Sequence, residues 1–95
     1  MNGASRRQVA VALGYDEAGP GVPQVLAKGY GFRAEDILRL AEAHSVPVRR
    51  DDDLAQTLSA LDVGALIPPE LYAAVAEVLA FLYRMNQLAS QRSKP

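Results

Sequence analysis

The segment VAVAL, residues 9–13, has five consecutive apolar residues close to the start of the 95-residue chain. A strand with one face in water alternates apolar and polar side chains, and this segment does not. Val9 and Val11 are β-branched, which favours a strand. We therefore predict a strand over residues 8–15 that lies centrally in its sheet, with covering layers on both faces.

The rest of the chain carries short apolar runs and apolar residues at helical spacing, which indicate five further elements. We predict a strand over 24–28, a helix over 33–44, a strand over 45–49, a helix over 54–61 and a long helix over 71–85. The order strand, strand, helix, strand, helix, helix is typical of an α/β domain. The expected fold is a small central sheet of three strands surrounded by helices.

Three local features refine these predictions. Pro47 has no N–H to donate, so the third strand should lie at an edge. One residue of the run Asp51-Asp52-Asp53 suits a helix N-cap better than a cation loop. The long helix carries a wide apolar stripe, which predicts packing against the sheet over much of its girth. The stripe comprises Leu71, Ala74, Val75, Val78, Leu82 and Met85, widened by Tyr72, Ala76, Leu79 and Tyr83.

Composition restricts the class of protein. Ten Lys and Arg residues face 11 Asp and Glu, and the net charge of −1 opposes nucleic-acid binding. The chain has no cysteine for a disulfide or thiolate, and no apolar run near the roughly 20 residues that span a bilayer. We expect a cytoplasmic chain with a flexible arm over 1–7, one domain over 8–89 and a disordered tail over 90–95.

The residues that could carry catalysis are few. His44 is the only histidine, and its place at a predicted helix end favours a role at the helix dipole. Without cysteine or a second histidine, a zinc site has no ligand set. We expect no enzyme activity, no metal and no cofactor.

Four stretches together resemble a known family. They are VAVALGYD (9–16), PQVLAKGYG (23–31), AHSVPVRRDDDLAQTL (43–58) and VGALIPPELYAAVAEVLAFLYRM (63–85). In this order they closely resemble the cytoplasmic C-terminal domain of the FlhB family, the export-switch proteins of flagellar and injectisome type III secretion. The resemblance implies a sheet of four strands ringed by helices, behind an N-terminal membrane domain. It also implies self-cleavage at an Asn-Pro-Thr-His loop, and contacts with export substrates and export-gate proteins.

The chain departs from that pattern at the cleavage loop. Ser5, Arg6, Arg7 and Gln8 stand where Asn-Pro-Thr-His is expected. Ser5 has no amide that could cyclise, so we expect no self-cleavage. The membrane domain and the strand that precedes the loop are not in this sequence. The chain is therefore expected to act as a stand-alone counterpart of the processed C-terminal fragment.

The expected function is a non-enzymatic component of a flagellar or type III export apparatus. The partners would be export-gate membrane proteins, the membrane-anchored half of a full-length paralogue, or export substrates, with neither nucleic acid nor membrane insertion. A partner strand would pair with the open edge of the first strand. One alternative is an independent α/β interaction domain with no remaining export role, which could close its sheet edge by homodimerising. The other is an enzyme or nucleotide binder on the same fold. Besides the degenerate loop, the candidate contact residues are Arg6, Arg7, Pro23, Lys28 and Tyr72.

Overall fold

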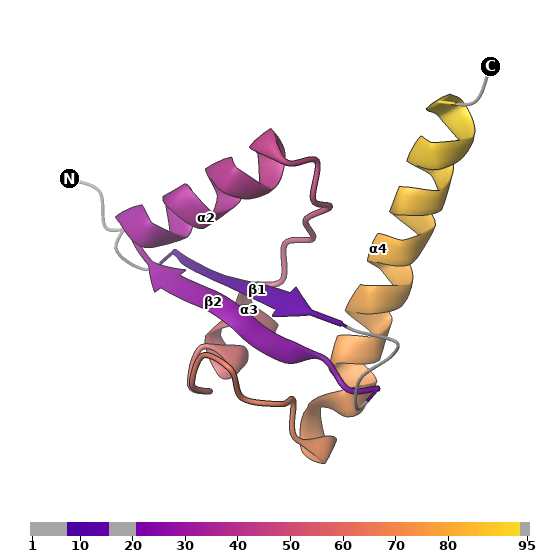
Figure 1. Ribbon diagram of the computed structural model, residues 1–95. Coiled ribbons are helices and arrows are strands. Elements are labelled where there is room, and N and C mark those ends of the chain that lie inside the picture. The colour runs from indigo at the N-terminus through magenta and orange to yellow at the C-terminus, as the bar shows by residue number, and fades with distance from the viewer. Residues whose placement is uncertain (1–7, 16–20, 94–95) are drawn as a thin grey trace.

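The computed structural model describes residues 8–15 and 21–93, with side chains described as far as Met85. An α/β fold is confirmed, and the arm predicted over residues 1–7 lies outside the described part. The elements in chain order are β1 (Val9–Gly14), β2 (Gln24–Tyr30), α2 (Phe32–Ala43), α3 (Asp52–Leu58), the 3-10 turn η1 (Pro69–Leu71) and α4 (Tyr72–Ser93) (Figure 1).

The strands β1 and β2 form an antiparallel hairpin. Val9 lies opposite Tyr30 at one end and Gly14 opposite Gln24 at the other, with an irregularity after Ala12. The beginning of the outer edge of β2, from Pro23 to Val25, pairs with residues 64–67, a pairing that sequence analysis did not predict. The N–H of Val25 donates to the carbonyl of Ala65 at 2.9 Å, and the N–H of Gly64 donates to the carbonyl of Val25 at 2.7 Å.

One face of the hairpin is built from small residues and receives α2. Ala10 and Gly29 lie opposite each other in the ladder, and both are buried. A Cβ on Gly29 would lie only 2.7 Å from the Cβ of Arg33, so glycine lets the first turn of α2 lie directly on the sheet. Ala34 in that turn is fully buried.

The other face of the hairpin carries the main hydrophobic core. Its buried members are Val25, Leu58, Ile67 and Val75, and Val11 and Leu13 pack against them. Both faces of β1 are therefore covered, as its apolar sequence predicts. The predicted central position is wrong, because β1 is the edge strand of the described sheet. The two faces of a strand can be covered by helices and a core even when no other strand pairs with its outer edge, so apolar residues on both faces do not imply a central position.

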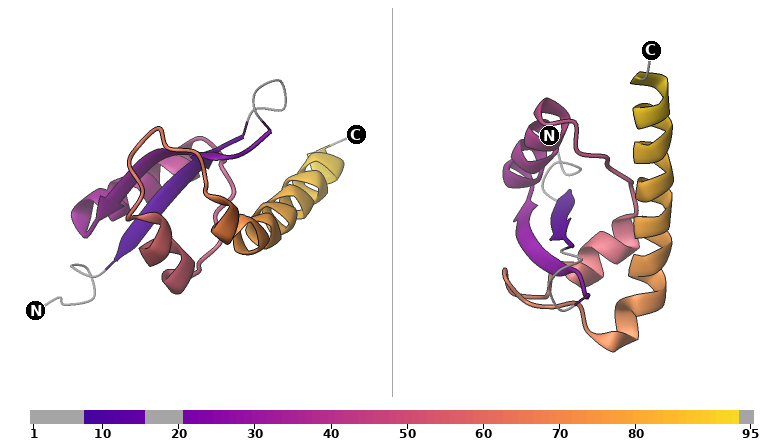
Figure 2. Two further views of the ribbon diagram at one scale, coloured as in Figure 1. Left: turned by 90° about the horizontal axis from the view of Figure 1, so that it is seen from below. Right: turned by 45° about the vertical axis from the view of Figure 1, so that its right-hand side comes forward.

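The predicted strand over residues 45–49 does not form in the described structure. These residues belong to the exposed connection between α2 and α3. Pro47 removes one ladder donor, and the described residues hold no strand on that side with which the segment could pair. Figures 1 and 2 place this connection on the side of β1 that faces away from β2.

The long helix is present but packs differently from the prediction. Of its described side chains only Val75 is buried, with Leu71 of η1 and Leu79 packed against the core. The rest of α4 projects beyond the hairpin as far as Ser93 (Figure 2), so it also includes residues predicted to lie in the tail. Packing over much of the girth is thus wrong, since the small sheet covers only the first turns of α4.

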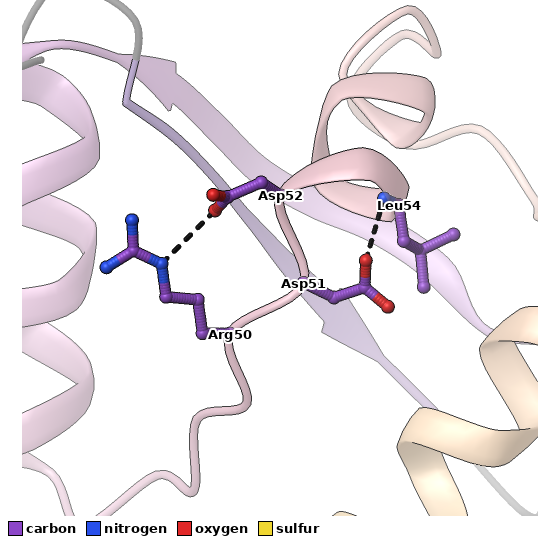
Figure 3. Close-up of polar contacts among 4 residues, drawn as sticks. All are labelled: Arg50, Asp51, Asp52 and Leu54. Carbon is purple, nitrogen blue, oxygen red and sulfur yellow. Dashed lines mark hydrogen bonds and ion pairs between the residues drawn. The ribbon is translucent and has the colours of Figure 1, made fainter.

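The N-terminus of α3 is capped as predicted. The carboxylate of Asp51 accepts a hydrogen bond from the N–H of Leu54 at 3.1 Å (Figure 3). Arg50 pairs with Asp52 at 3.3 Å, but both side chains are largely exposed, so this pair adds little stability. The aspartate run therefore begins a helix.

We expect Asp51→Ala to lower the free energy of unfolding by about 1 kcal/mol, because it leaves helix N–H groups without their acceptor. The matched control is Asp53→Ala, which removes the same charge from the same turn but no cap bond. Urea denaturation measures both. Equal losses in the two variants would contradict the capping role of Asp51.

The C-terminus of α2 offers a second stability test. Ser45 has φ 57°, while the N–H of Val46 donates to the carbonyl of Ala41 at 2.8 Å, which is the geometry of a glycine-type helix end. We expect Ser45→Gly to stabilise the protein by about 0.5–1 kcal/mol, because glycine adopts this conformation without steric cost. Ala43→Gly, inside the same helix, should destabilise it. Thermal unfolding that ranks the two variants the other way would contradict this.

Candidate protein-binding site

An apolar groove of about 840 Å³ lies between α4 and the end of the hairpin. The hairpin contributes Tyr15, Gly21, Val22 and Pro23, and Ile67 and Pro47 complete this side. The opposite wall is the face of α4 formed by Tyr72, Val75, Ala76, Leu79, Ala80, Leu82 and Tyr83. The described lining residues are all uncharged and mostly apolar, so this part of the groove suits an apolar partner.

The spacing of residues along α4 builds this wall. Tyr72, Ala76, Leu79 and Tyr83 recur at intervals of four, three and four, which places them on one face. Tyr72 is 45% exposed and Tyr83 is 65% exposed. The small alanines between these tyrosines leave room for an incoming side chain. A large apolar surface left open in this way is typical of a protein-interaction site.

Two of the predicted contact residues, Pro23 and Tyr72, come together in this groove. Pro23 is buried in its floor, and its carbonyl accepts a hydrogen bond from the N–H of Ile67 at 3.0 Å. The groove as a whole was missed by sequence analysis. The available signal was a stripe on the last helix that is wider than a two-stranded sheet can cover.

Lys28 lies elsewhere and is already engaged. Its Nζ donates to the carbonyl of Ser59 at 2.9 Å and to that of Leu61 at 2.7 Å. These carbonyls follow the last turn of α3, where a cation is favourable. The side chain therefore ties β2 to the end of α3, and this geometry does not support its predicted role as a partner contact.

The degenerate cleavage loop falls mostly outside the described residues. Ser5, Arg6 and Arg7 are not described, and Gln8 lies directly before β1. The carbonyl of Gln8 accepts a hydrogen bond from the N–H of Gly31 at 2.8 Å, so this residue begins the pairing of the hairpin.

The outer edge of β1 is the second candidate surface. Because Gln8 points its carbonyl at β2, the alternation of an antiparallel ladder points the backbone groups of Val9 and Val11 away from β2. Within the described part of the chain, no other segment pairs with this edge. The edge thus presents free N–H and carbonyl groups on a strand whose faces are both covered.

Neither a metal site nor a membrane span is found among the residues described. No three His, Cys, Asp or Glu side chains there gather closely enough to hold a metal ion. No helix of the described part is both long and apolar enough to cross a bilayer.

Comparison with known proteins gives a consistent family. The family model described as the FlhB HrpN YscU SpaS family matches residues 7–82. YlqH of Bacillus subtilis is 38% identical over 78 residues, which cover 82% of this chain and 84% of YlqH. The flagellar biosynthetic protein FlhB of Yersinia enterocolitica is 46% identical over 79 residues, 82% of this chain. The chain spans only 21% of the length of that FlhB.

Solved structures agree with the sequence match. A mutated EscU/SpaS C-terminal domain superposes with a TM-score of 0.77 at 27% identity, over 81% of this chain and 96% of that domain. The PscU C-terminal domain gives a TM-score of 0.73 at 33% identity, over 79% of this chain and 96% of that domain. From its sequence match and from its fold, the chain belongs to the FlhB HrpN YscU SpaS family.

Proposed function

We propose that this chain is a non-enzymatic binding module of a flagellar or type III protein export apparatus. The observation that carries the proposal is the open edge of β1 in a domain whose fold is that of the family's C-terminal domains. The chain would work in the cytoplasm, beside the membrane proteins of the export gate. The match to YlqH, over most of the length of that protein, supports a role for the domain without an attached membrane region.

The mechanism we propose is strand addition at β1. An incoming strand would bond to the backbone groups of Val9 and Val11, which point away from β2. The two faces of β1 are already covered by α2 and by the core, so the added strand would extend an existing sheet. The donor would be the membrane-anchored half of a full-length family member.

Self-cleavage is not part of this role. The proposal rests on the sequence, in which Ser5 and Arg6 stand at the positions of the Asn and Pro of the family's loop. In asparagine, the side-chain amide nitrogen attacks the residue's own carbonyl and closes a cyclic imide as the peptide bond breaks. A serine has no side-chain amide and cannot react in this way. Arg6 and Arg7 would instead contact the partner beside the added strand, which stays a prediction.

The apolar groove would serve a second step, the recognition of export substrates. Its described lining residues are uncharged and include three partly exposed tyrosines, Tyr15, Tyr72 and Tyr83, so an apolar segment of a substrate would bury its side chains there. The alternative to strand addition from a partner protein is a homodimer, in which two copies of the chain pair through the edge of β1. Native mass spectrometry of the purified chain distinguishes a monomer with an open edge from such a dimer, and a stable dimer would favour the alternative.

A proline substitution tests strand addition. Val11→Pro removes an N–H that faces away from β2, so it should leave the hairpin paired and yet weaken partner binding about tenfold, which corresponds to one lost hydrogen bond. The matched control Val11→Ala loses similar packing but keeps the N–H. The measurement is co-purification with the membrane-anchored half of Yersinia enterocolitica FlhB that lacks its C-terminal piece.

If Val11→Pro does not fold, Val9→Pro tests the same edge at the first residue of the strand, where proline is better tolerated. Equal binding by the proline and alanine variants would rule out strand addition. Failure of the unmodified chain to bind that half would contradict the proposed role altogether.

A charge tests the groove. Ala76 lines it and is exposed, so Ala76→Glu should place a carboxylate against the incoming apolar segment and weaken substrate binding about tenfold. Ala74→Glu adds the same charge to the same helix at an exposed position that does not line the groove. Binding to a purified flagellar hook subunit is compared by calorimetry. Similar weakening in both variants would mean that the groove is not the contact surface.

A further inference from the structure

We infer that strand addition at β1 and binding in the apolar groove strengthen each other through the connection between α2 and α3. The inference rests on the proposed function and adds a rule for how its two surfaces communicate. It is carried by residues 46–50, which border both surfaces.

The connection is part of the groove. Pro47 lines it directly, opposite the wall formed by α4. Two residues further on, the guanidinium carbon of Arg49 lies 5.3 Å from the ring centroid of Phe81 on α4, a cation–π contact. The position of this connection therefore sets the distance between Pro47 and the α4 wall of the groove.

The same connection is weakly held along its backbone. Among the described residues, no backbone hydrogen bond joins 47–50 to another segment, and every residue from Ser45 to Arg50 is exposed. Val46 and Val48 are about half exposed although β-branched residues favour a strand. The segment has strand-forming residues but no partner in the part of the chain described.

An added strand would supply that partner. The connection passes on the side of β1 that faces away from β2 (Figures 1 and 2). A strand seated on the edge of β1 would lie on the side of β1 along which the connection passes, so its second edge would face the exposed residues 46–50. Pairing there orders the connection, and with it Pro47 and Arg49.

The thermodynamic consequence is positive coupling. A groove ligand binds more tightly when part of its site is already ordered, because its binding free energy is then not reduced by the conformational entropy lost on ordering the connection. The effect must be reciprocal, so a groove ligand also tightens strand binding by the same factor. A strand that continued from the edge into the groove would do the opposite, because the two ligands would then compete.

The experiment uses two probes on the full chain. The first is a synthetic peptide with the strand that precedes the cleavage loop in Yersinia enterocolitica FlhB. The second is the fluorescent apolar dye bis-ANS, with Ala76→Glu used to verify that the dye reports the groove. We expect saturating peptide to tighten dye binding by at least about fivefold, within the usual range of coupling between two sites.

Two arginine variants test the route. Arg49→Ala removes the contact with Phe81 and should reduce the coupling to less than about twofold. Arg50→Ala removes a neighbouring charge whose ion pair in the described structure is with exposed Asp52, and should keep the coupling. Hydrogen exchange gives a readout that needs no variant, because the amides that face the added strand, either those of Val48 and Arg50 or that of Arg49, should become protected when the peptide binds.

The outcomes separate the inference from the proposed function. Binding of both probes without mutual effect, competition between them, or unchanged exchange at residues 48–50 would overturn the inference and leave the binding role intact. Failure of the peptide to bind would overturn both. Equal coupling in Arg49→Ala and Arg50→Ala would overturn the route through Phe81.

Discussion

The hydrogen bonding of β2 is the constraint on which the rest of the fold depends. One edge of β2 pairs with β1, and the beginning of the other edge, at Pro23 and Val25, pairs with residues 64–67. The second pairing also directs Ile67 into the core beside Val25, and from there η1 leads into α4 with Val75 buried. Among the described residues, no segment pairs with the outer edge of β1, whereas the outer edge of β2 is paired at its beginning.

A lysine completes this arrangement from inside the domain. The Nζ of Lys28 on β2 donates to the carbonyls of Ser59 and Leu61. The hydroxyl of Tyr30 donates to the same carbonyl of Ser59 at 3.3 Å. These contacts hold the end of α3 against the sheet, while Asp51 holds its beginning. Both ends of α3 are thus held in place. In the described structure, residues 47–50 before it make no backbone hydrogen bond to another segment, and Pro47 lines the groove.

Local chemistry was predictable where a few neighbouring residues decide the outcome. The cap at Asp51 and the strand at VAVAL each depend on near neighbours in sequence. The strand predicted over 45–49 failed because a strand needs a partner, and composition says nothing about whether one is present. The roles of Lys28 and of residues 64–67 were missed because each depends on a contact with an element distant in sequence: Lys28 is 31 residues from Ser59.

By itself the sequence determined the α/β class, the family and the apolar nature of both faces of β1, because those properties follow from residue types and their spacing. Only the tertiary structure decided that residues 64–67 pair with β2, that α4 projects from the domain, and that Pro23 and Tyr72 share a groove. The physical reason is that a two-stranded sheet can cover only the first turns of a long amphipathic helix. How much of an apolar stripe remains open depends on the area available to cover it, and that area exists only once the elements have packed.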